Sequence, residues 1–581
     1  MSIIVSCSRG HNASTTLMVD GEVIFYVEEE RLSRTKHDGG PLLGLIKVFE
    51  YVDHIDHLVI CHTHRDGPTI DWTGEDLYHG LIRKLSKGKF EYKVYFVDVI
   101  HHEMHAACAF YNSGFKTAAC VIADGAGSFI HEPEVHPKVM YEFETIFKAK
   151  YPFRFETVYK HMGTDHPVGV QQIKPGITYL TEYPGITKTY EAVTRYCGFS
   201  SIDAGKTMGL SPYGKENPEI PQLFNGKYSN RSVFIPTYPS GAIINKNGYE
   251  ILNEDSKKHK PKEYTQVQKD LAYAVQKQSS DRMVELIRYA HEATGETNIV
   301  VCGGYGLNCV ANYKYLKEFP DLNIYCEPIA HDGGTSLGGA KYIYSKLTRN
   351  KEAMSPQTSI YYGPKYDPKS YMDELSGYEV TDTSYDDVAK LIRDGNIVTI
   401  FQGRSEAGPR ALGNRSILFD PTVKDGKDIV NKVKHREFFR PFACSIKKEA
   451  VHDWFDLAGR EESPHMMYAV DALPGVAEKI PSVIHVDNTC RIQTVTPEQN
   501  EHYYNLIDAF EKLSEVPILF NTSFNLGGDP LVEQLEDAID TLERCAIDWL
   551  YLPEIQKLVN IPQSKVRKSP KEFITGSNPI A

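Results

Sequence analysis

The sequence predicts an α/β fold built as two successive domains. Three observations support this prediction. The chain opens with three short apolar runs separated by turn residues, strand-like and helix-patterned segments then alternate, and the alternation stops over residues 346–364 before it resumes. With 581 residues, the chain is long enough for several domains that each bury their own core.

The opening segment predicts three strands, at residues 3–8, 15–19 and 23–28. Asp20-Gly21, between the second and the third, is typical of a tight hairpin turn. Small polar residues fill the first turn, at residues 10–14. Actin-like and sugar-kinase-like ATPases begin in this way, although many other α+β proteins also open with three strands.

Further strands and helices alternate through the first domain. We expect strands at residues 57–61, 94–98, 118–124 and 298–302, and helices at residues 101–112 and 267–292. Gly303-Gly304-Tyr305-Gly306 then opens a further helix. Alternation of this kind predicts a sheet covered by helices.

A domain boundary is predicted within residues 346–364, which lose hydrophobic periodicity and gain polar residues, proline and glycine. The first domain is expected to span residues 1–355 and the second residues 356–581. The second has strands of its own at residues 397–401 and 517–521, together with helices, so it should also be an α/β domain. No internal sequence repeat is visible.

Composition excludes several classes of protein. Hydrophobic residues make up 41% of the chain and charged residues 24%, which is ordinary for a globular protein, and no apolar run approaches the roughly 20 residues of a membrane helix. A net charge of −13 argues against a protein that coats nucleic acid over its whole surface. The 11 cysteines are scattered and include no CxxC pair. We therefore expect a reduced, cytoplasmic protein with no signal peptide and no membrane segment.

Two histidines and two aspartates form a candidate metal site. His101 and His105 are four residues apart in a predicted helix, so both side chains project from one face. Asp124 ends a predicted strand and Asp332 precedes a predicted helix, and each is followed by glycine. A turn-forming Asp-Gly is the plainer interpretation of either aspartate alone. Together the four donors suit one divalent ion, Fe(II), Mn(II) or Zn(II).

A glycine-rich segment between a strand and a helix indicates a nucleotide site. It reads Cys302-Gly303-Gly304-Tyr305-Gly306-Leu307-Asn308. Glycines there allow a nucleotide to approach the backbone closely, with its phosphates near the helix start. The alternative interpretation is a plain tight turn.

Cations and glycines gather in the second domain. Arg404, Arg410 and Arg415 lie among glycines in residues 403–416, and further polar and cationic residues follow, namely Asn431, Lys434, Arg436, Arg440, Arg491 and residues 521–525. Arginine forks beside glycine-rich backbone suit a doubly charged phosphate ligand. A solvated basic face is the alternative, but the interleaved Gly, Pro, Leu and Phe residues favour a lined pocket.

On these residues the chain resembles the O-carbamoyltransferase family, which includes the nodulation-factor, cephamycin and aminoglycoside antibiotic carbamoyltransferases. The matching blocks run in order through nearly the whole chain, at residues 10–14, 28–37, 101–110, 123–125, 208–214, 303–312, 331–334, 408–416, 440–442, 491–495 and 521–525.

The resemblance implies a fold and an activity. The first domain would be actin-like, similar to the protein that transfers threonylcarbamoyl to tRNA, and the second would be YrdC-like, similar to threonylcarbamoyladenylate synthase. The second domain would use carbamoyl phosphate and ATP to make carbamoyladenylate and pyrophosphate. The first would pass the carbamoyl group to an acceptor hydroxyl, with AMP leaving.

The resemblance also implies roles for single residues. His101, His105, Asp124 and Asp332 match the metal positions, with Fe(II) expected first. Gly304 and Asn308 match nucleotide contacts, and Asp124 is also expected to contribute to the cofactor site; ATP is the expected nucleotide, accompanied by magnesium. The positions that match the carbamoyl-phosphate region are Arg410, Arg440, Arg491 and Ser523.

Asn12 and Lys36 fall where the acceptor binds in the family. Many members have aspartate at the position of Asn12, so an uncharged acceptor is indicated here. His11, Lys36 and Arg410 are the candidate catalytic residues. Either His11 or a metal-bound group would remove the acceptor proton.

Two other interpretations compete with this one: an enzyme of tRNA threonylcarbamoylation, and a non-catalytic actin-like nucleotide-binding protein. The acceptor itself is open between a sugar or natural product and a hydroxymethylated pyrimidine in a nucleotide or DNA. A nucleic-acid acceptor would require three basic stretches to converge: Arg83, Lys84, Lys87, Lys89 and Lys93 with Phe90 and Tyr92; Lys257, Lys258, Lys260 and Lys262; and Lys565, Arg567, Lys568 and Lys571.

Overall fold

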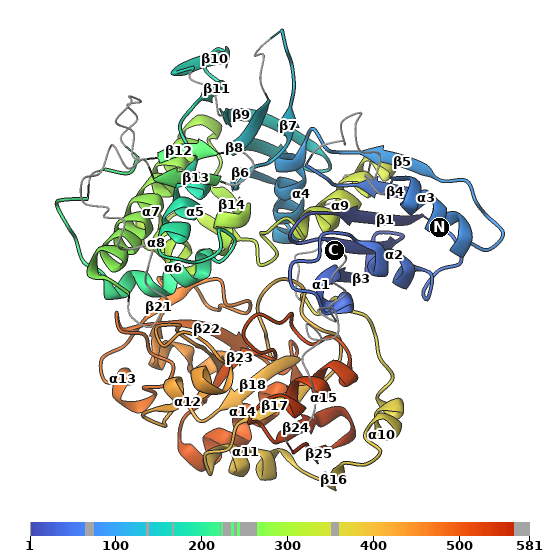
Figure 1. Ribbon diagram of the computed structural model, residues 1–581, viewed down its shortest axis with the longest axis vertical. Helices are drawn as coiled ribbons and strands as arrows, with labels where there is room; N and C mark the ends of the chain where they lie inside the picture. The colour runs from blue at the N-terminus through green and yellow to red at the C-terminus, as the bar shows by residue number, and fades with distance from the viewer. Residues whose placement is uncertain are drawn as a thin grey trace, which may run out of the picture.

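The computed structural model describes residues 2–63, 75–134, 139–164, 168–220, 222–224, 234–237, 241–244, 264–349 and 359–562. It confirms the two-part α/β architecture, with two large sheets in the first part and a third sheet in the second part (Figure 1). The predicted boundary between residues 355 and 356 lies outside the described residues. Within these ranges no helix is both long and apolar enough to cross a membrane.

The first sheet has the strand order β3-β2-β1-β4-β5. Antiparallel pairing joins β1 to β2 and β2 to β3, whereas β4 and β5 continue the sheet in parallel. At the predicted turn Asp20 and Gly21 both have positive φ angles, as a tight hairpin requires. The strands are β1 (Ile3–Ser8), β2 (Ser14–Val19), β3 (Glu22–Glu28), β4 (His57–Ile60) and β5 (Lys93–Phe96).

The second sheet repeats this arrangement at its centre, in the order β9-β8-β6-β14-β15. Its antiparallel and parallel pairs occur at the same places as in the first sheet. This duplicated topology is that of the actin-like fold. The strands are β6 (Thr117–Ala123), β7 (Phe129–Ile130), β8 (Met140–Lys150), β9 (Arg154–Gly163), β10 (Val170–Lys174), β11 (Thr178–Thr181), β14 (Asn298–Cys302) and β15 (Asn323–Cys326), and β12 (Phe234–Thr237) pairs separately with β13 (Gly241–Ile244).

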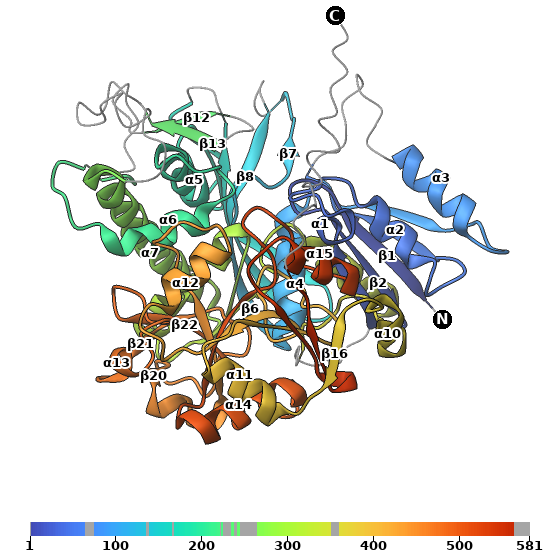
Figure 2. The ribbon, with the colours of Figure 1, turned by 60° about the horizontal axis from the view of Figure 1, so that its bottom comes forward.

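Two helices, α4 (His101–Ser113) and α9 (Gly334–Thr348), pack between the two sheets (Figure 1). Alternate residues of β6 face opposite sides. Cys120 and Ile122 pack toward α4 and α9, whereas Val121 packs toward α5 (Ile186–Tyr196) and α7 (Gln266–Thr294). Figure 2 shows α4 on one side of β6, and α5 and α7 on the other. Both faces of this sheet are therefore buried, which explains the unbroken apolar run of β6.

The second part is built on a ten-stranded sheet in the order β16-β25-β24-β17-β18-β23-β19-β22-β21-β20. Its strands are β16 (Glu379–Asp382), β17 (Val398–Phe401), β18 (Arg415–Phe419), β19 (Ala443–Lys447), β20 (Phe455–Asp456), β21 (Ala469–Ala472), β22 (Thr489–Val495), β23 (Ile518–Ser523), β24 (Trp549–Leu552) and β25 (Lys557–Asn560). The remaining helices are α1 (Glu29–Ser33), α2 (Leu42–Val48), α3 (Glu75–Leu85), α6 (Ala204–Leu210), α8 (Cys309–Glu318), α10 (Tyr371–Glu374), α11 (Tyr385–Arg393), α12 (Gly426–Val433), α13 (Val476–Lys479), α14 (Glu501–Ser514) and α15 (Leu535–Glu543).

Side-chain donors join the two parts by binding main-chain carbonyl oxygens across the boundary. Arg404 donates to the Ile24 carbonyl in β3, and Arg460 donates to the Ile324 carbonyl in β15, at 2.6 and 2.7 Å. Asn312 of α8 donates to the Met467 carbonyl at 3.1 Å. These contacts hold the second part against β3, β15 and α8 of the first.

All 11 cysteines are buried free thiols, distributed over both parts of the chain.

The close approach of α9 to α4 depends on a glycine. A Cβ atom at Gly338 would collide with the Met104 carbonyl oxygen and would lie 2.9 Å from the Cys108 amide nitrogen, both in the main chain of α4. Since a helix backbone cannot yield as a side chain can, α9 tolerates no side chain at this position.

We expect Gly338→Ala to destabilise the protein by about 1–3 kcal/mol, because the added methyl group forces α9 away from α4. Gly80→Ala is the matched control, since Gly80 is exposed in α3 with open space around it, and alanine there should stabilise the helix by up to about 1 kcal/mol. Thermal unfolding of both variants measures the difference. Equal unfolding midpoints for Gly338→Ala and the unchanged protein would contradict the packing argument.

Candidate active site

Helix α4 is held at its N-terminus by groups from the second sheet. The His101 amide donates to Ser128 Oγ at 2.9 Å, and the Ser128 amide donates to Glu142 Oε2, also at 2.9 Å. The His102 amide approaches the same carboxylate oxygen at 3.4 Å. A carboxylate at this end satisfies amides that have no partner within the helix and interacts favourably with its dipole. The position of α4, and of its histidines, is therefore fixed by β8.

His101, His105, Asp124 and Asp332 converge as predicted, with one ligand atom from each lying within 4.8 Å of the others. His101 Nε2 and His105 Nε2 are 3.1 Å apart. Asp332 Oδ1 lies 3.6 and 3.5 Å from these two nitrogens, and Asp124 Oδ2 lies 3.8 Å from His101 Nε2. Two ring nitrogens and two carboxylate oxygens aimed at one point form a donor set that fits a divalent transition metal.

Within this cluster, the histidines stabilise the ionised form of Asp332, and the aspartates stabilise the protonated form of His101. Burial raises the energy of the ionised Asp332 carboxylate, but hydrogen bonds from His101 and His105 outweigh burial and hold the pKa of Asp332 well below its usual value. Burial likewise opposes protonation of His101, while Asp332 and then Asp124 raise its pKa. The carboxylates therefore remain ionised, as metal ligands must be.

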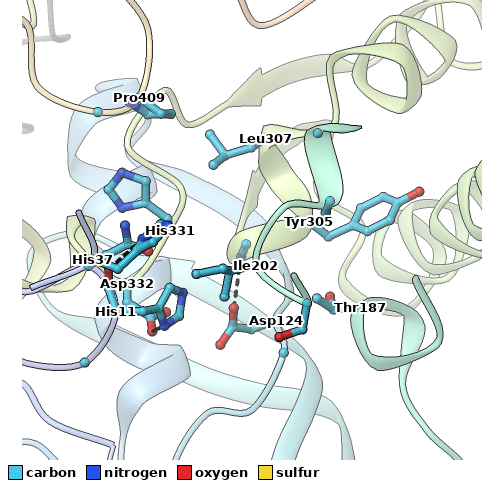
Figure 3. A pocket seen from close by; sticks show the side chains of 18 of the residues that line it. His11, His37, Asp124, Thr187, Ile202, Tyr305, Leu307, His331, Asp332 and Pro409 are labelled. Atoms are coloured by element: carbon cyan, nitrogen blue, oxygen red, sulfur yellow. Dashed lines mark hydrogen bonds and ion pairs between the residues drawn. The ribbon is translucent and has the colours of Figure 1, made fainter. Parts of the chain in front are cut away.

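A cavity of about 520 Å³ runs from this cluster to the second part of the chain. Nine of the predicted site residues line it: His11, Asn12, Lys36, Asp124, Gly304, Asn308, Asp332, Arg410 and Ser523. In Figure 3, His11 and His37 lie together with His331 and Asp332 on one side, Asp124 and Thr187 lie across from them, and Pro409 of the second part lies near Leu307. One cavity thus adjoins both candidate sites.

The glycine-rich turn after β14 forms the wall beside Asp124. Gly303 has a φ of 86°, and a Cβ atom there would collide with the Ala123 carbonyl oxygen, so the residue must be glycine. The next amide, of Gly304, donates to Asp124 Oδ1 at 3.0 Å. Asp124 therefore uses one oxygen to hold the turn and presents the other to His101.

The side chain of Asn308 is locked in one orientation. The Ala311 amide donates to Asn308 Oδ1 at 3.1 Å, which places Nδ2 on the other side of the amide group. Gln276 pairs with both atoms, as its Nε2 donates to Oδ1 at 3.1 Å and its Oε1 accepts from Nδ2 at 3.0 Å. The second hydrogen of Nδ2 has no acceptor within the described part of the chain and can donate to a ligand in the cavity.

The opposite wall carries the predicted acceptor residues. Asp332 Oδ2, the oxygen that does not face the α4 histidines, lies 3.9 Å from His11 Nδ1. Lys36 Nζ donates to the buried Glu30 at 2.6 Å, and the His37 amide donates to the other oxygen of Glu30 at 3.0 Å. Glu30 thus holds the segment that presents Lys36 and His37 to the cavity.

Five cations gather at the other end of the cavity: Arg410, Lys434, Arg436, Arg440 and Arg491. Burial lowers the pKa of Arg410 to about 9, assisted by Arg491 and Arg440, and burial with Arg440 and Arg491 does the same for Arg436. Burial and then Arg436 lower the pKa of Lys434 well below its usual value. The Nε atoms of Arg410 and Arg491 are buried with no hydrogen-bond partner among the described residues. Apart from Arg440, which pairs with Glu437 at 3.7 Å, these cations have no carboxylate partner among the described residues, and they are suited to an anionic ligand.

Only one of the three arginines in residues 403–416 belongs to this cluster. Arg415 is fully buried, lies over the Phe401 ring and donates to main-chain carbonyls, including that of Glu533. Arg404 also donates to carbonyls, as described above. Arg410 makes one such contact, to the Leu307 carbonyl at 3.1 Å, and is otherwise directed at the cavity end.

Lys434 and Arg436 are among the cations noted in the sequence of the second domain, but the sequence gives neither a specific role. Lys434 and Arg436 contact Ser523, and Lys434 also reaches Asn525 Oδ1 at 3.4 Å. In the sequence these are two cations two residues apart, but this spacing does not reveal that β23 places Ser523 beside them. Of the five cations only Arg410 lines the cavity. Lys434 and Arg436 reach it through Ser523, which does line it, and Arg440 and Arg491 lie close enough to lower the pKa of Arg410.

The basic stretches proposed for nucleic acid receive no support. In the first stretch, Lys87 and Lys89 pair with Asp53 and Asp56, and no residue of the stretch lines the cavity. The other two stretches lie outside the described residues.

Comparison with known proteins identifies the family. The family models for the carbamoyltransferase N-terminus and C-terminus match residues 72–341 and 389–557. The nodulation protein NolNO of Sinorhizobium fredii is 31% identical over 571 residues, which cover 93% of this chain and 78% of that protein. The nodulation protein NolO of Bradyrhizobium diazoefficiens is also 31% identical, over 78% of this chain and 77% of that protein.

Solved structures are more distant. Full-length HypF in its phosphate- and nucleotide-bound form has a TM-score of 0.35 and 11% identity, over 60% of this chain and 56% of that one. The assignment therefore rests on the sequence matches, which cover both parts of the chain in order, and by these matches the chain belongs to the carbamoyltransferase family and is an enzyme that transfers carbamoyl groups.

Proposed function

We propose that this enzyme is an ATP-dependent O-carbamoyltransferase that moves the carbamoyl group of carbamoyl phosphate, through carbamoyladenylate, to the hydroxyl of a small acceptor. The observation that carries the proposal is the single cavity with a cation cluster at one end and a His/Asp cluster at the other. The two ends suit the two half-reactions that such a transfer requires.

The first half-reaction belongs to the cation cluster. Carbamoyl phosphate is hydrolysed to carbamate and inorganic phosphate, and a carbamate oxygen then bonds to the α-phosphorus of ATP while the bond to pyrophosphate breaks. Both steps release a phosphate group with several negative charges. Arg410, Lys434 and Arg436 lie where they would bind these anions and stabilise the charge that develops as each one leaves.

The second half-reaction belongs to the other end of the cavity. The acceptor oxygen attacks the carbamoyl carbon, the bond from that carbon to the phosphate oxygen breaks, and AMP leaves. His11 is placed to take the acceptor proton, because it is half exposed in the cavity and its Nδ1 faces Asp332 Oδ2. Asn12 and Lys36, on the same wall, are proposed to bind the acceptor, and the neutral Asn12 favours an uncharged hydroxyl compound.

The nucleotide is proposed to lie between Asp124 and Asn308. The Asn308 amide hydrogen left free by the Gln276 pair would donate to it, and Gly304 permits close approach of its phosphates. His101, His105, Asp124 and Asp332 would hold the metal, which supplies positive charge beside the AMP phosphate. Fe(II) is the proposed metal, with Mn(II) and Zn(II) as alternatives, and magnesium would accompany ATP.

We expect Arg410→Ala to slow carbamoyl-phosphate-dependent release of pyrophosphate by about 10- to 100-fold, because a hydrogen bond to a charged group contributes about 1.5–3 kcal/mol. Pyrophosphate release from the full chain measures this effect. Arg282→Ala serves as the control, since Arg282 is an exposed arginine of α7 paired only with Glu285 among the described residues. Pyrophosphate release at the unchanged rate in Arg410→Ala would show that the phosphate pocket is misassigned.

We expect the double variant His101→Ala/His105→Ala to lose its bound metal and to lose carbamoyl transfer, while pyrophosphate release continues. The reason is that both ligands come from α4 in the first part, whereas the cation cluster lies in the second. Metal content per chain, determined by elemental analysis, and AMP formation with an acceptor panel measure the two effects.

The control for this double variant is His502→Ala, which removes a histidine that pairs with Tyr385 far from the cavity. Unchanged metal content in the double variant would refute the metal assignment, and loss of pyrophosphate release along with transfer would refute the division of the reaction between the two ends.

A further inference from the structure

Two loops, one from each part of the chain, pack directly against each other between the two ends of the cavity. The Asp332 loop, residues 327–332, leads from β15 toward α9. The Arg410 loop, residues 406–410, belongs to the second part. A Cβ atom at Gly408 would lie 2.9 Å from the Pro328 carbonyl oxygen, so no side chain fits between the two main chains. Ala407 and Ile329 belong to one apolar cluster.

Arg31 of α1 holds the Arg410 loop from the first part of the chain. Its Nη1 donates to the Glu406 carbonyl and its Nη2 to the Gly408 carbonyl, the latter at 2.6 Å. The Glu406 side chain in turn accepts from the Leu412 and Asn414 amides, at 2.6 and 2.9 Å, so the turn around Arg410 is ordered from both sides. Only 3% of Arg31 is exposed, which leaves it little room for another conformation.

Glu28, at the end of β3, connects Arg31 to the other loop. Its Oε1 atom lies 3.5 Å from Arg31 Nη2 and 3.4 Å from His331 Nε2. The Gly333 amide donates to His331 Nδ1 at 3.0 Å, so Nδ1 is an acceptor and the hydrogen on Nε2 faces Glu28. One buried carboxylate thus lies between Arg31, which holds the Arg410 loop, and the neutral ring of His331 in the Asp332 loop.

The contact is more specific than a general attraction between the two parts. The guanidinium group binds two carbonyl oxygens of one turn at once, a geometry that an ammonium group cannot reproduce. Arg460 also crosses between the parts, but it binds the single Ile324 carbonyl and touches neither loop. Glu28 is the carboxylate that acts most strongly on Arg31 and also lies 3.4 Å from His331 Nε2, so neutralising it weakens the compensation of a buried guanidinium and the link to the Asp332 loop.

We propose that Arg31 is a positioning residue for the first half-reaction: together with Glu28 it sets the place of the Arg410 loop relative to the Asp332 loop, and so couples the anion-binding end of the cavity to the transfer end. This inference rests on the proposed function for the role of Arg410 in binding phosphate groups. It assigns to two residues of the first part an effect on chemistry in the second.

Affinity for inorganic pyrophosphate, measured by calorimetry on the full chain, tests the proposal without requiring turnover. Arg31→Lys should weaken pyrophosphate binding about 10-fold and speed hydrogen exchange of the amides in residues 406–410, since lysine keeps the charge but loses one of the two carbonyl contacts. Glu28→Gln, which leaves Arg31 in place, should weaken binding in the same direction. Arg460→Lys, the matched control, should stay within 2-fold of the unchanged protein.

The outcomes separate the alternatives. Unchanged pyrophosphate affinity in Arg31→Lys overturns the positioning role, and unchanged affinity in Glu28→Gln overturns the coupling to the Asp332 loop. An equal loss in Arg460→Lys would show a general effect of the boundary and would also overturn the proposal. A parallel assay of the unchanged protein for carbamoyl-phosphate-dependent pyrophosphate release tests the proposed function by itself. If no pyrophosphate is released, the proposed function is wrong, and the affinity comparison still decides the role of Arg31.

Discussion

Main-chain carbonyl oxygens that accept from arginine side chains fix how the two parts of the chain meet. Arg31, Arg34, Arg404 and Arg460 all donate to main-chain carbonyl oxygens across the boundary. The acceptors in these contacts are neutral carbonyl groups with only a partial negative charge, so the contacts between the two parts require few carboxylates. The geometry of the cavity, which needs both parts in register, depends on them.

Two groups of buried cations can therefore be distinguished. Those at the boundary and in the turn before β18 donate mainly to backbone carbonyls, as Arg415 does. Those at the cavity end have neighbours of the same charge and buried donors without partners. Repulsion and desolvation make the second group costly in the empty protein, and an anionic ligand removes that cost. The same residue type thus supports the fold in one group and recognition in the other.

Much of the fold could be predicted from local pattern. The strand at residues 298–302 agrees with β14, and the helix predicted at residues 101–112 differs from α4 by one residue. Local pattern could not predict the order of strands in the duplicated sheets, because the residues of a strand indicate which of its faces are buried but not which strands lie beside it. The four metal-site candidates converge as expected, because their spacing and their positions at element ends are local signals.

Residue pattern alone does not show which arginine serves which purpose. Arg404, Arg410 and Arg415 lie in one glycine-rich block; the family resemblance selects Arg410, and the fold shows that Arg404 and Arg415 each bind several carbonyls. Glu28, Glu30 and Arg31 belong to one block that matches the family, but the sequence suggests no role for them. Their partners lie as far as 377 residues away along the chain. Long-range pairing of buried charge leaves no periodic trace in a sequence.

The burial of every thiol has a practical consequence. A thiol reacts with disulfide reagents as its thiolate, and burial raises the pKa of Cys7, Cys120 and Cys302, among others, well above the usual value. The native chain therefore offers such a reagent no reactive sulfur until some segment opens. Because the cysteines are spread from β1 to the end of α15, labelling kinetics followed sulfur by sulfur would map the opening free energy of each region, with no probe added to the protein.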